Sequence, residues 1–77
     1  MHTKEDSIKT MIAIVSSVLP YETITAESTM MNVDTWDSLS HMGIMAAISK
    51  ETGITLSQTE MMLTDSVLSL AQIIREG

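Results

Sequence analysis

Helical periodicity is the feature that most limits what this chain can fold into. In the segment 4–19 the apolar residues recur every three or four positions, which places them on one face of an α-helix. These residues are Ile8, Met11, Ile12, Val15, Val18 and Leu19. Either Thr3 or Asp6 can cap the start of this helix. Pro20 disfavours helical geometry at Leu19, so we expect the helix to end there.

A second helix is expected from Ser38 to about Glu51, where Gly53 supplies a stop signal two residues later. Its apolar residues again follow helical spacing. They are Leu39, Met42, Met45, Ala46 and Ile48, and Ile44 widens the stripe. Gly43 and the two alanines are small, which permits the close approach of another helix or of a ligand, although ordinary tight packing is the preferred explanation of them.

The rest of the chain predicts one short helix and one longer helix. Ser57 and Glu60 form an S-x-x-E capping box at the start of the short helix, whose apolar residues are Met61, Met62 and Leu63. The last helix is capped by either Asp65 or Ser66. Its buried stripe is expected to consist of Val67, Leu70, Ala71 and Ile74.

A long polar connection separates the first two helices and runs from Tyr21 to Trp36. Its four largest aliphatic side chains are expected to anchor it on the core: Ile24, Met30, Met31 and Val33. Three longer helices and one short helix with such a loop predict an all-α fold, a small antiparallel four-helix bundle. With 77 residues, we expect a single domain covering residues 1–77.

Composition excludes several functional classes. Ten acidic and four basic residues give a formal net charge of −6, which argues against binding to nucleic acid. The chain has no cysteine, so any thiol chemistry has to come from an attached cofactor. The longest apolar run is far too short to cross a membrane, and we see no signal peptide, so a cytoplasmic protein is expected. The eight methionines are expected mostly to fill irregular gaps in the core.

The junction at residues 34–42 is the most informative part of the chain. Asp37 is a good N-cap, because its carboxylate can accept N–H groups from the first helical turn. Ser38 is then the first helical residue, where free N–H groups and the positive end of the helix dipole favour a phosphate ester. Trp36 and His41 occupy the two positions of a hydrophobic staple. Ser38 is therefore either an ordinary helix-start residue or a modification site.

The sequence Asp37-Ser38-Leu39, with the apolar residues that follow it and the stretch 54–56, resembles the acyl carrier protein family. The resemblance implies that Ser38 carries a covalent 4′-phosphopantetheine arm, which a phosphopantetheinyl transferase moves from coenzyme A. The thiol of the arm would hold an acyl, aminoacyl or peptidyl group as a thioester. The longer form Trp36-Asp37-Ser38-Leu39-x-His41 resembles free-standing carriers outside housekeeping fatty-acid synthesis.

The resemblance also implies where partner enzymes bind. Leu39 and Met42 would form an apolar contact beside the arm, and Ala46 would continue it along the helix. Fatty-acid carriers have an acid-rich helix here, but in this chain Glu51 is the only acid of the predicted helix. This difference favours a specialised pathway such as polyketide, peptide or surface-polysaccharide assembly. We expect a monomer that works with acyl-loading, acyl-transfer or condensing enzymes.

Other chemistry is poorly supported by the sequence. Catalysis by Ser38 would need a histidine directed at it, and His41 is expected to point away along the helix, as a solvated or Trp-stacked residue. Asp34 and Asp37 could help to hold Mg²⁺ during modification, but turn and cap roles explain them, and no metal site is expected. The remaining alternative is a non-catalytic helical interaction module in which Ser38 only starts a helix.

Overall fold

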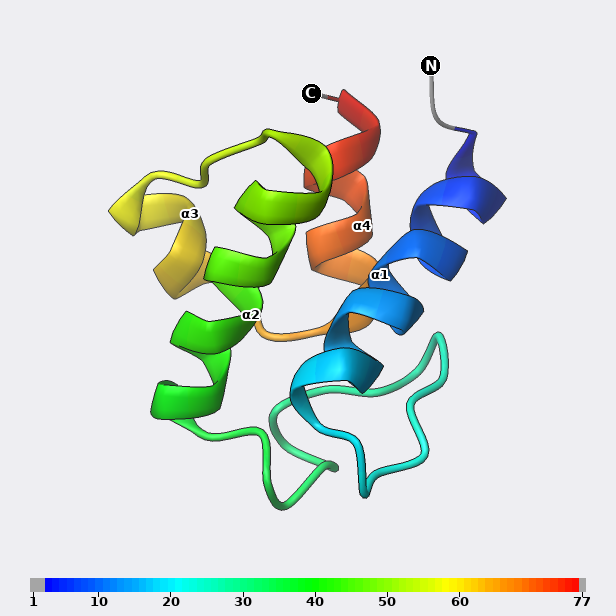
Figure 1. Cartoon of the computed structure of the whole chain (residues 1–77), viewed down its shortest axis with the longest axis vertical. Coiled ribbons are helices and arrows are strands. Elements are labelled where there is room, and N and C mark those ends of the chain that lie inside the picture. The colour runs from blue at the N-terminus through cyan, green and yellow to red at the C-terminus, as the bar shows by residue number, and fades with distance from the viewer. Residues whose placement is uncertain (1–2, 77) are drawn as a thin grey trace.

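The computed structural model describes residues 3–76 and confirms the all-α prediction (Figure 1). The described residues form four helices: α1 (Lys4–Val18), α2 (Ser38–Thr52), α3 (Gln58–Leu63) and α4 (Val67–Glu76). Within these residues the β-type pairing is one isolated antiparallel bridge between Thr29 and Ser66. The observed helix ends lie within a residue of the predicted ones for α1 and α2.

Side-chain caps define where the helices begin. The Asp6 N–H donates to Thr3 Oγ1 at 3.1 Å, so Thr3 and not Asp6 caps α1. The Ser69 N–H donates to Ser66 Oγ at 3.1 Å, which resolves the choice at α4 in favour of Ser66. The end of α2 is set by Gly53, whose φ of 74° lies in the left-handed region that residues with a Cβ rarely adopt.

The short helix α3 starts as its sequence predicts. The Glu60 N–H donates to Ser57 Oγ at 3.1 Å, and the Ser57 N–H donates back to Glu60 Oε1 at 2.9 Å. This reciprocal pair satisfies two N–H groups that have no partner within the helix. The helix is thus stabilised by its own residues at its start.

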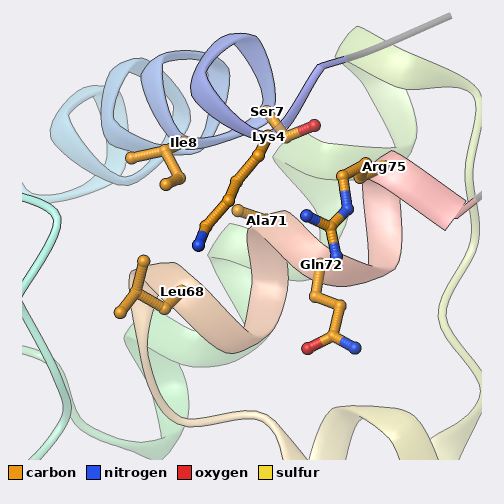
Figure 2. Close-up of a pocket in the computed structure, with 7 residues that line it drawn as sticks. All are labelled: Lys4, Ser7, Ile8, Leu68, Ala71, Gln72 and Arg75. Carbon is orange, nitrogen blue, oxygen red and sulfur yellow. The ribbon is translucent and has the colours of Figure 1, made fainter.

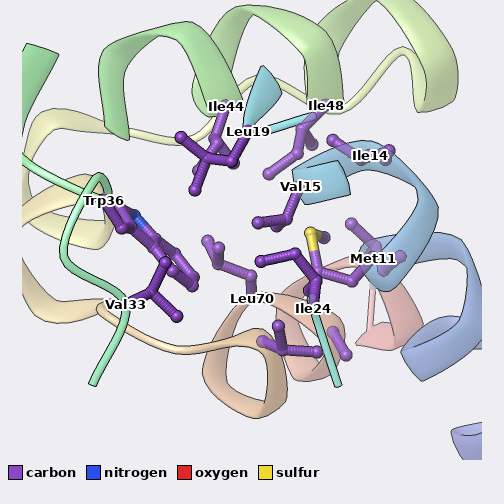
Figure 3. Packing of buried hydrophobic residues seen from close by; sticks show 13 residues of the cluster. Met11, Ile14, Val15, Leu19, Ile24, Val33, Trp36, Ile44, Ile48 and Leu70 are labelled. Atoms are coloured by element: carbon purple, nitrogen blue, oxygen red, sulfur yellow. The ribbon is translucent and has the colours of Figure 1, made fainter. Parts of the chain in front are cut away.

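The hydrophobic core lies where α1 packs against α4 and α2 (Figure 3). The apolar side chains that build it are buried in all three of these helices and in the first loop: Met11, Ile14, Val15, Leu19, Ile24, Val33, Trp36, Ile44, Ile48, Val67, Leu70, Ala71 and Ile74. All four predicted core residues of α4 are among them, and so are Met11, Val15 and Leu19 of the predicted first stripe. Helix α3 contributes no buried residue.

Only part of the apolar stripe of α2 faces this core. Ile44 and Ile48 are fully buried, and Met45 is half-buried against the core. The stripe predicted from the sequence joined two faces of α2: on a helix with 3.6 residues per turn, Leu39 lies about 180° around from Ile48, and the core covers only the Ile48 side. Its remaining members, Leu39, Met42 and Ala46, are exposed.

The first loop is fixed to the core by three of its four predicted anchors. Ile24 and Val33 are buried, and Met30 packs partly buried against the core. The prediction for Met31 was wrong, since its side chain is 90% exposed. The reason is a local turn: the N–H groups of Met31 and Asn32 both donate to Thr29 Oγ1, which leaves Met31 at the outer side of the turn.

Two backbone hydrogen bonds tie this loop to the segment that precedes α4. The Met30 N–H donates to the Asp65 carbonyl at 2.8 Å, and the Val67 N–H donates to the Ser28 carbonyl at 3.0 Å. The loop thereby spans the bundle and delivers the chain to Trp36, whose side chain is only 2% exposed. The start of α2 follows directly. None of the helices in residues 3–76 has both the length and the apolar character needed to cross a membrane.

Candidate functional site

The start of α2 is held in place by Asp37, Ser40 and Thr35. Asp37 has extended backbone geometry, and its Oδ1 accepts the Ser40 N–H at 2.8 Å. The Ser40 hydroxyl donates to the Thr35 carbonyl at 2.9 Å, which ties the first turn of the helix to the loop before it. Asp37 therefore caps α2 as the sequence predicts, and the position of the next residue is fixed.

The carboxyl group of Asp37 is stabilised in its charged form. Its pKa is lowered, first because the Ser40 N–H donates to the carboxylate and then because the Ser40 side chain also interacts with it. A negative N-cap is also favoured by the positive end of the helix dipole. Asp37 thus acts as a charged cap at neutral pH.

Ser38 lies at the first helical position, and its side chain is exposed. Hydrogen bonds fix both Asp37 and Ser40, whereas the Ser38 hydroxyl has no hydrogen-bond partner among residues 3–76. It can therefore be esterified without breaking a contact of the fold. A phosphopantetheine group fits this position, because the arm would extend from an exposed hydroxyl and not from a packed one.

A methionine-rich pocket of about 330 Å³ borders Ser38. We call this the Met pocket. Its walls come from the first loop, the start of α2, helix α3 and the residues that follow α3: Met30, Ser38, His41, Met42, Met61, Met62, Thr64 and Asp65. Methionine side chains are flexible and polarisable, so a pocket with four of them can adapt to apolar groups of different shapes.

His41 is not the solvated or Trp-stacked residue that the sequence suggested. It is 6% exposed, and its ring is tilted by 34° from the Trp36 ring at a centroid distance of 6.1 Å. The Trp36 indole Nε1–H donates to His41 Nδ1 at 3.1 Å, and His41 Nε2 lies 3.0 Å from the Met61 carbonyl oxygen. The staple positions are thus confirmed as neighbours, but a hydrogen bond joins them.

This geometry also bears on catalysis by Ser38. Both ring nitrogens of His41 are engaged, one by Trp36 and the other by Met61. Neither is directed at the Ser38 hydroxyl, as a general base would have to be. The sequence predicts that Trp36 and His41 are neighbours. It does not predict the second hydrogen-bond partner of His41, the Met61 carbonyl of α3, which is 20 residues further along the chain.

The three residues predicted to contact partner enzymes are exposed on α2. Leu39 is 79% and Met42 is 59% exposed, and Ala46 is also exposed. Met42 lines the Met pocket, whereas Leu39 and Ala46 do not. Their contact with partners stays a prediction, and their accessibility is compatible with it.

The two aspartates considered for magnesium do not form part of a larger cluster. Asp37 is used as the cap of α2, and Asp34 is exposed. No group of three or more acidic, histidine or cysteine side chains within residues 3–76 could hold a metal ion. His2, the second histidine of the chain, lies outside the described residues.

A second hollow lies between α1 and α4 (Figure 2). It has a volume of about 250 Å³ and an apolar floor, and Lys4 and Arg75 extend over it from the two helices. Since the start of α1 and the end of α4 lie at the opposite end of the bundle from the start of α2, these two cations are remote from Ser38 (Figure 1). This hollow is therefore separate from the Met pocket.

Comparison with known families agrees with the geometry of the α2 start. Residues 9–74 match the family model described as "Phosphopantetheine attachment site", which covers most of the chain and includes the junction before α2. The chain therefore belongs to the family of carrier domains to which a phosphopantetheine group is covalently attached. A search of curated proteins found no match.

Proposed function

We propose that this chain is an acyl carrier protein and that Ser38 is the residue that carries its phosphopantetheine arm. The observation that supports this most strongly is the exposed Ser38 hydroxyl, which has no hydrogen-bond partner in the described fold and stands at the first position of α2. In a chain of the phosphopantetheine-attachment family, such a hydroxyl is the natural acceptor.

Attachment requires little from the chain itself. The Ser38 oxygen forms a bond to the phosphorus that bears the pantetheine of coenzyme A, and the bond from that phosphorus to the nucleotide part breaks. The adenosine bisphosphate leaves, and the hydroxyl proton passes to a base of the transferase. Asp37 and Ser40 hold the serine at a fixed place throughout. Once attached, the group supplies a thiol that can bind an acyl or aminoacyl cargo as a thioester.

The chain acts as a presenter of cargo and not as an enzyme. Partner enzymes supply the catalytic groups, and the exposed residues Leu39, Met42 and Ala46 form the surface that they contact. Because Glu51 is the only acid of α2, we expect a mainly apolar docking contact and a specialised biosynthetic pathway. We further propose that the chain works as a single domain and a monomer in the cytoplasm.

The competing function is a non-catalytic interaction module. The same exposed apolar side chains could bind a helix of another protein without any modification of Ser38. The two functions differ in one property, since only a carrier accepts the phosphopantetheine group.

Intact-mass spectrometry tests the proposal. The purified chain is incubated with coenzyme A and each of several phosphopantetheinyl transferases of broad specificity. We expect wild type to gain the mass of one phosphopantetheine group and Ser38→Ala to gain none. Ser57→Ala is the matched control, because Ser57 is also an exposed serine at a helix start, and it should be modified as wild type is. No mass gain in wild type with any transferase would favour the interaction module.

A further inference from the structure

We propose that His41 is a positioning residue that ties α3 to the start of α2 and thereby maintains the wall of the Met pocket beside Ser38. Its use in presenting cargo rests on the proposed carrier function, but the tie itself does not. His41 is buried, and neither the cap of α2 nor the attachment of the arm uses it.

The hydrogen bonds of His41 define one protonation state. An indole Nε1–H can only donate, so His41 Nδ1 must carry a lone pair at the 3.1 Å contact with Trp36. A backbone carbonyl can only accept, so His41 Nε2 must carry the proton at the 3.0 Å contact with Met61. The neutral Nε2–H tautomer is the only form that satisfies both partners, and the two contacts support each other.

Helix α3 has few other attachments to the bundle. It has only 6 residues and none of them is buried, and its capping box involves only its own residues and Ser57. Met62 and Leu63 are 75% and 76% exposed. Within residues 3–76, the bond between His41 and Met61 is the one side-chain hydrogen bond that reaches residues 58–63 from another helix.

On the side away from α3, the His41 ring is held by a core residue. Trp36 is 2% exposed in the core, and it holds the His41 ring through the indole N–H. After α3, buried Thr64 bonds back to the Glu60 carbonyl at 2.8 Å, and Asp65 accepts the Met30 N–H. Helix α3 is therefore attached at its C-terminal side by the chain and along its length by His41.

Loss of the His41 bond should therefore affect one region selectively. His41 and Met61 both line the Met pocket, so release of α3 changes the pocket and the surface next to Ser38. The contact between α1 and α4 involves neither residue. A residue that only fills the core would instead lower the stability of all four helices together.

The first test is made on the wild-type apo protein. Nitrogen-15 NMR of the imidazole at neutral pH is expected to show a protonated Nε2 and an unprotonated Nδ1 for His41, and the Trp36 indole proton should have the shift of a hydrogen-bonded group. Observation of the Nδ1–H tautomer, or of a charged ring, would overturn the proposal. This measurement needs no variant and does not depend on the carrier function.

The second test uses hydrogen exchange of backbone amides in three variants. His41→Phe loses both hydrogen bonds of the ring, of which one is made to α3, so exchange within residues 61–64 should become about three- to tenfold faster relative to the α1 amides, as expected for the loss of that one bond. His41→Gln can place an amide N–H near the Met61 carbonyl and should restore most of the protection, whereas the shorter His41→Asn should not. Unchanged exchange at 61–64 in a folded His41→Phe, or an equal increase in all helices, would contradict the proposal.

The two proposals can fail separately. If His41 has the predicted tautomer and its variants change exchange in α3 as expected, but the wild type accepts no phosphopantetheine, the role of His41 is supported and the carrier function is contradicted. If the wild type is loaded on Ser38, but exchange in α3 is the same in the His41 variants as in wild type, the carrier function is supported and the role of His41 is contradicted.

Discussion

Helices α3 and α4 are both rich in apolar residues, but they differ sharply in how they are buried. Helix α4 buries Val67, Leu70, Ala71 and Ile74 among its 10 residues, and α3 buries none of its 6. The difference is one of position, since α4 packs along α1 while α3 lies at the side of α2 (Figure 1). Apolar composition alone therefore does not decide burial in this chain.

The side of the bundle that carries α3 is also the side that carries Ser38. Exposed apolar residues that gather in one place mark an interaction surface or a binding groove. The α1–α4 side supplies stability, and the α2–α3 side presents the serine and the Met pocket.

The largest expected effect comes from one and the same substitution made in both helices. Leu70→Ala removes a fully buried side chain from α4 and should lower the free energy of unfolding by about 2–5 kcal/mol. Leu63→Ala removes a side chain of α3 that is 76% exposed, and it should change the free energy of unfolding by less than about 0.5 kcal/mol. Urea denaturation followed by circular dichroism measures the free energy of unfolding of Leu63→Ala, and the helical signal without urea shows whether Leu70→Ala is still folded.

A domain of this size has only about 3–5 kcal/mol of stability to lose, so Leu70→Ala should be largely unfolded. Ile48→Ala in α2 should behave like Leu70→Ala, because Ile48 is also fully buried. Equal stabilities of the Leu70 and Leu63 variants would show that the two helices are not divided as we describe.

The second prediction concerns binding on the α2–α3 side. For a native partner enzyme and the holo protein, Met42→Ala should raise the dissociation rate several-fold, because it removes an apolar side chain from the docking surface that we propose. Raising salt from low to physiological concentration should mainly slow association, since it screens attraction between the net charge of −6 and a basic partner. Surface plasmon resonance at two salt concentrations measures both rates.

Met31→Ala is the control for this experiment. Met31 is an even more exposed methionine, at 90%, but it does not line the Met pocket, so its truncation should leave the dissociation rate unchanged. If Met42→Ala dissociates as wild type does and moderate salt abolishes binding, the partner recognises charge on the loops and α2 is not the docking surface.

The third and smallest prediction compares the caps of α2 and α4. The pKa of Asp37 is lowered by its bonds to Ser40, so its charged form stabilises the fold above the usual aspartate pKa, and this contribution is lost as pH falls through the lowered value. Ser66, which caps α4, is uncharged. Below about pH 4, the Ser40 amide resonance should therefore titrate while that of Ser69 does not.

Asp37→Asn is the matched variant, because an asparagine can still cap the helix but has no charge to lose. Its Ser40 amide should show no titration in the acidic range, and its melting temperature should fall less than that of wild type on acidification. Titration of the Ser40 amide in Asp37→Asn at the same pH as in wild type would show that another group is responsible.

Most of the fold could be predicted from the sequence. The helix predictions that depend on neighbouring residues were confirmed. They are the apolar spacing of α1 and α4, the helix ends at Pro20 and Gly53, and the Ser57–Glu60 capping box. The expected α2 stripe was wrong in part, because it joined residues from two faces of the helix. With 3.6 residues per turn, Leu39, Met42 and Ala46 lie about 120–180° around the helix from Ile48, and they are exposed while Ile48 is buried.

The candidate site was predictable only in its local part. Asp37 as the cap and Ser38 as the first helical residue follow from residues that are adjacent in sequence. The burial of His41 depends on Trp36, which is near it in sequence, and on the Met61 carbonyl. Tertiary packing brings that carbonyl to His41, so neighbouring residues do not reveal it. The exposure of Met31 depends on the turn made by Thr29 and Asn32, which hydrophobicity does not reveal.

Fragmentation mass spectrometry of the loaded protein locates the attachment site of the arm, which we propose to be the serine at the start of α2. After proteolysis of the holo form, we expect the phosphopantetheine group on Ser38 alone, with Ser40 and Ser57 unmodified. A group located on any other residue, with Ser38 unmodified, would contradict this proposal.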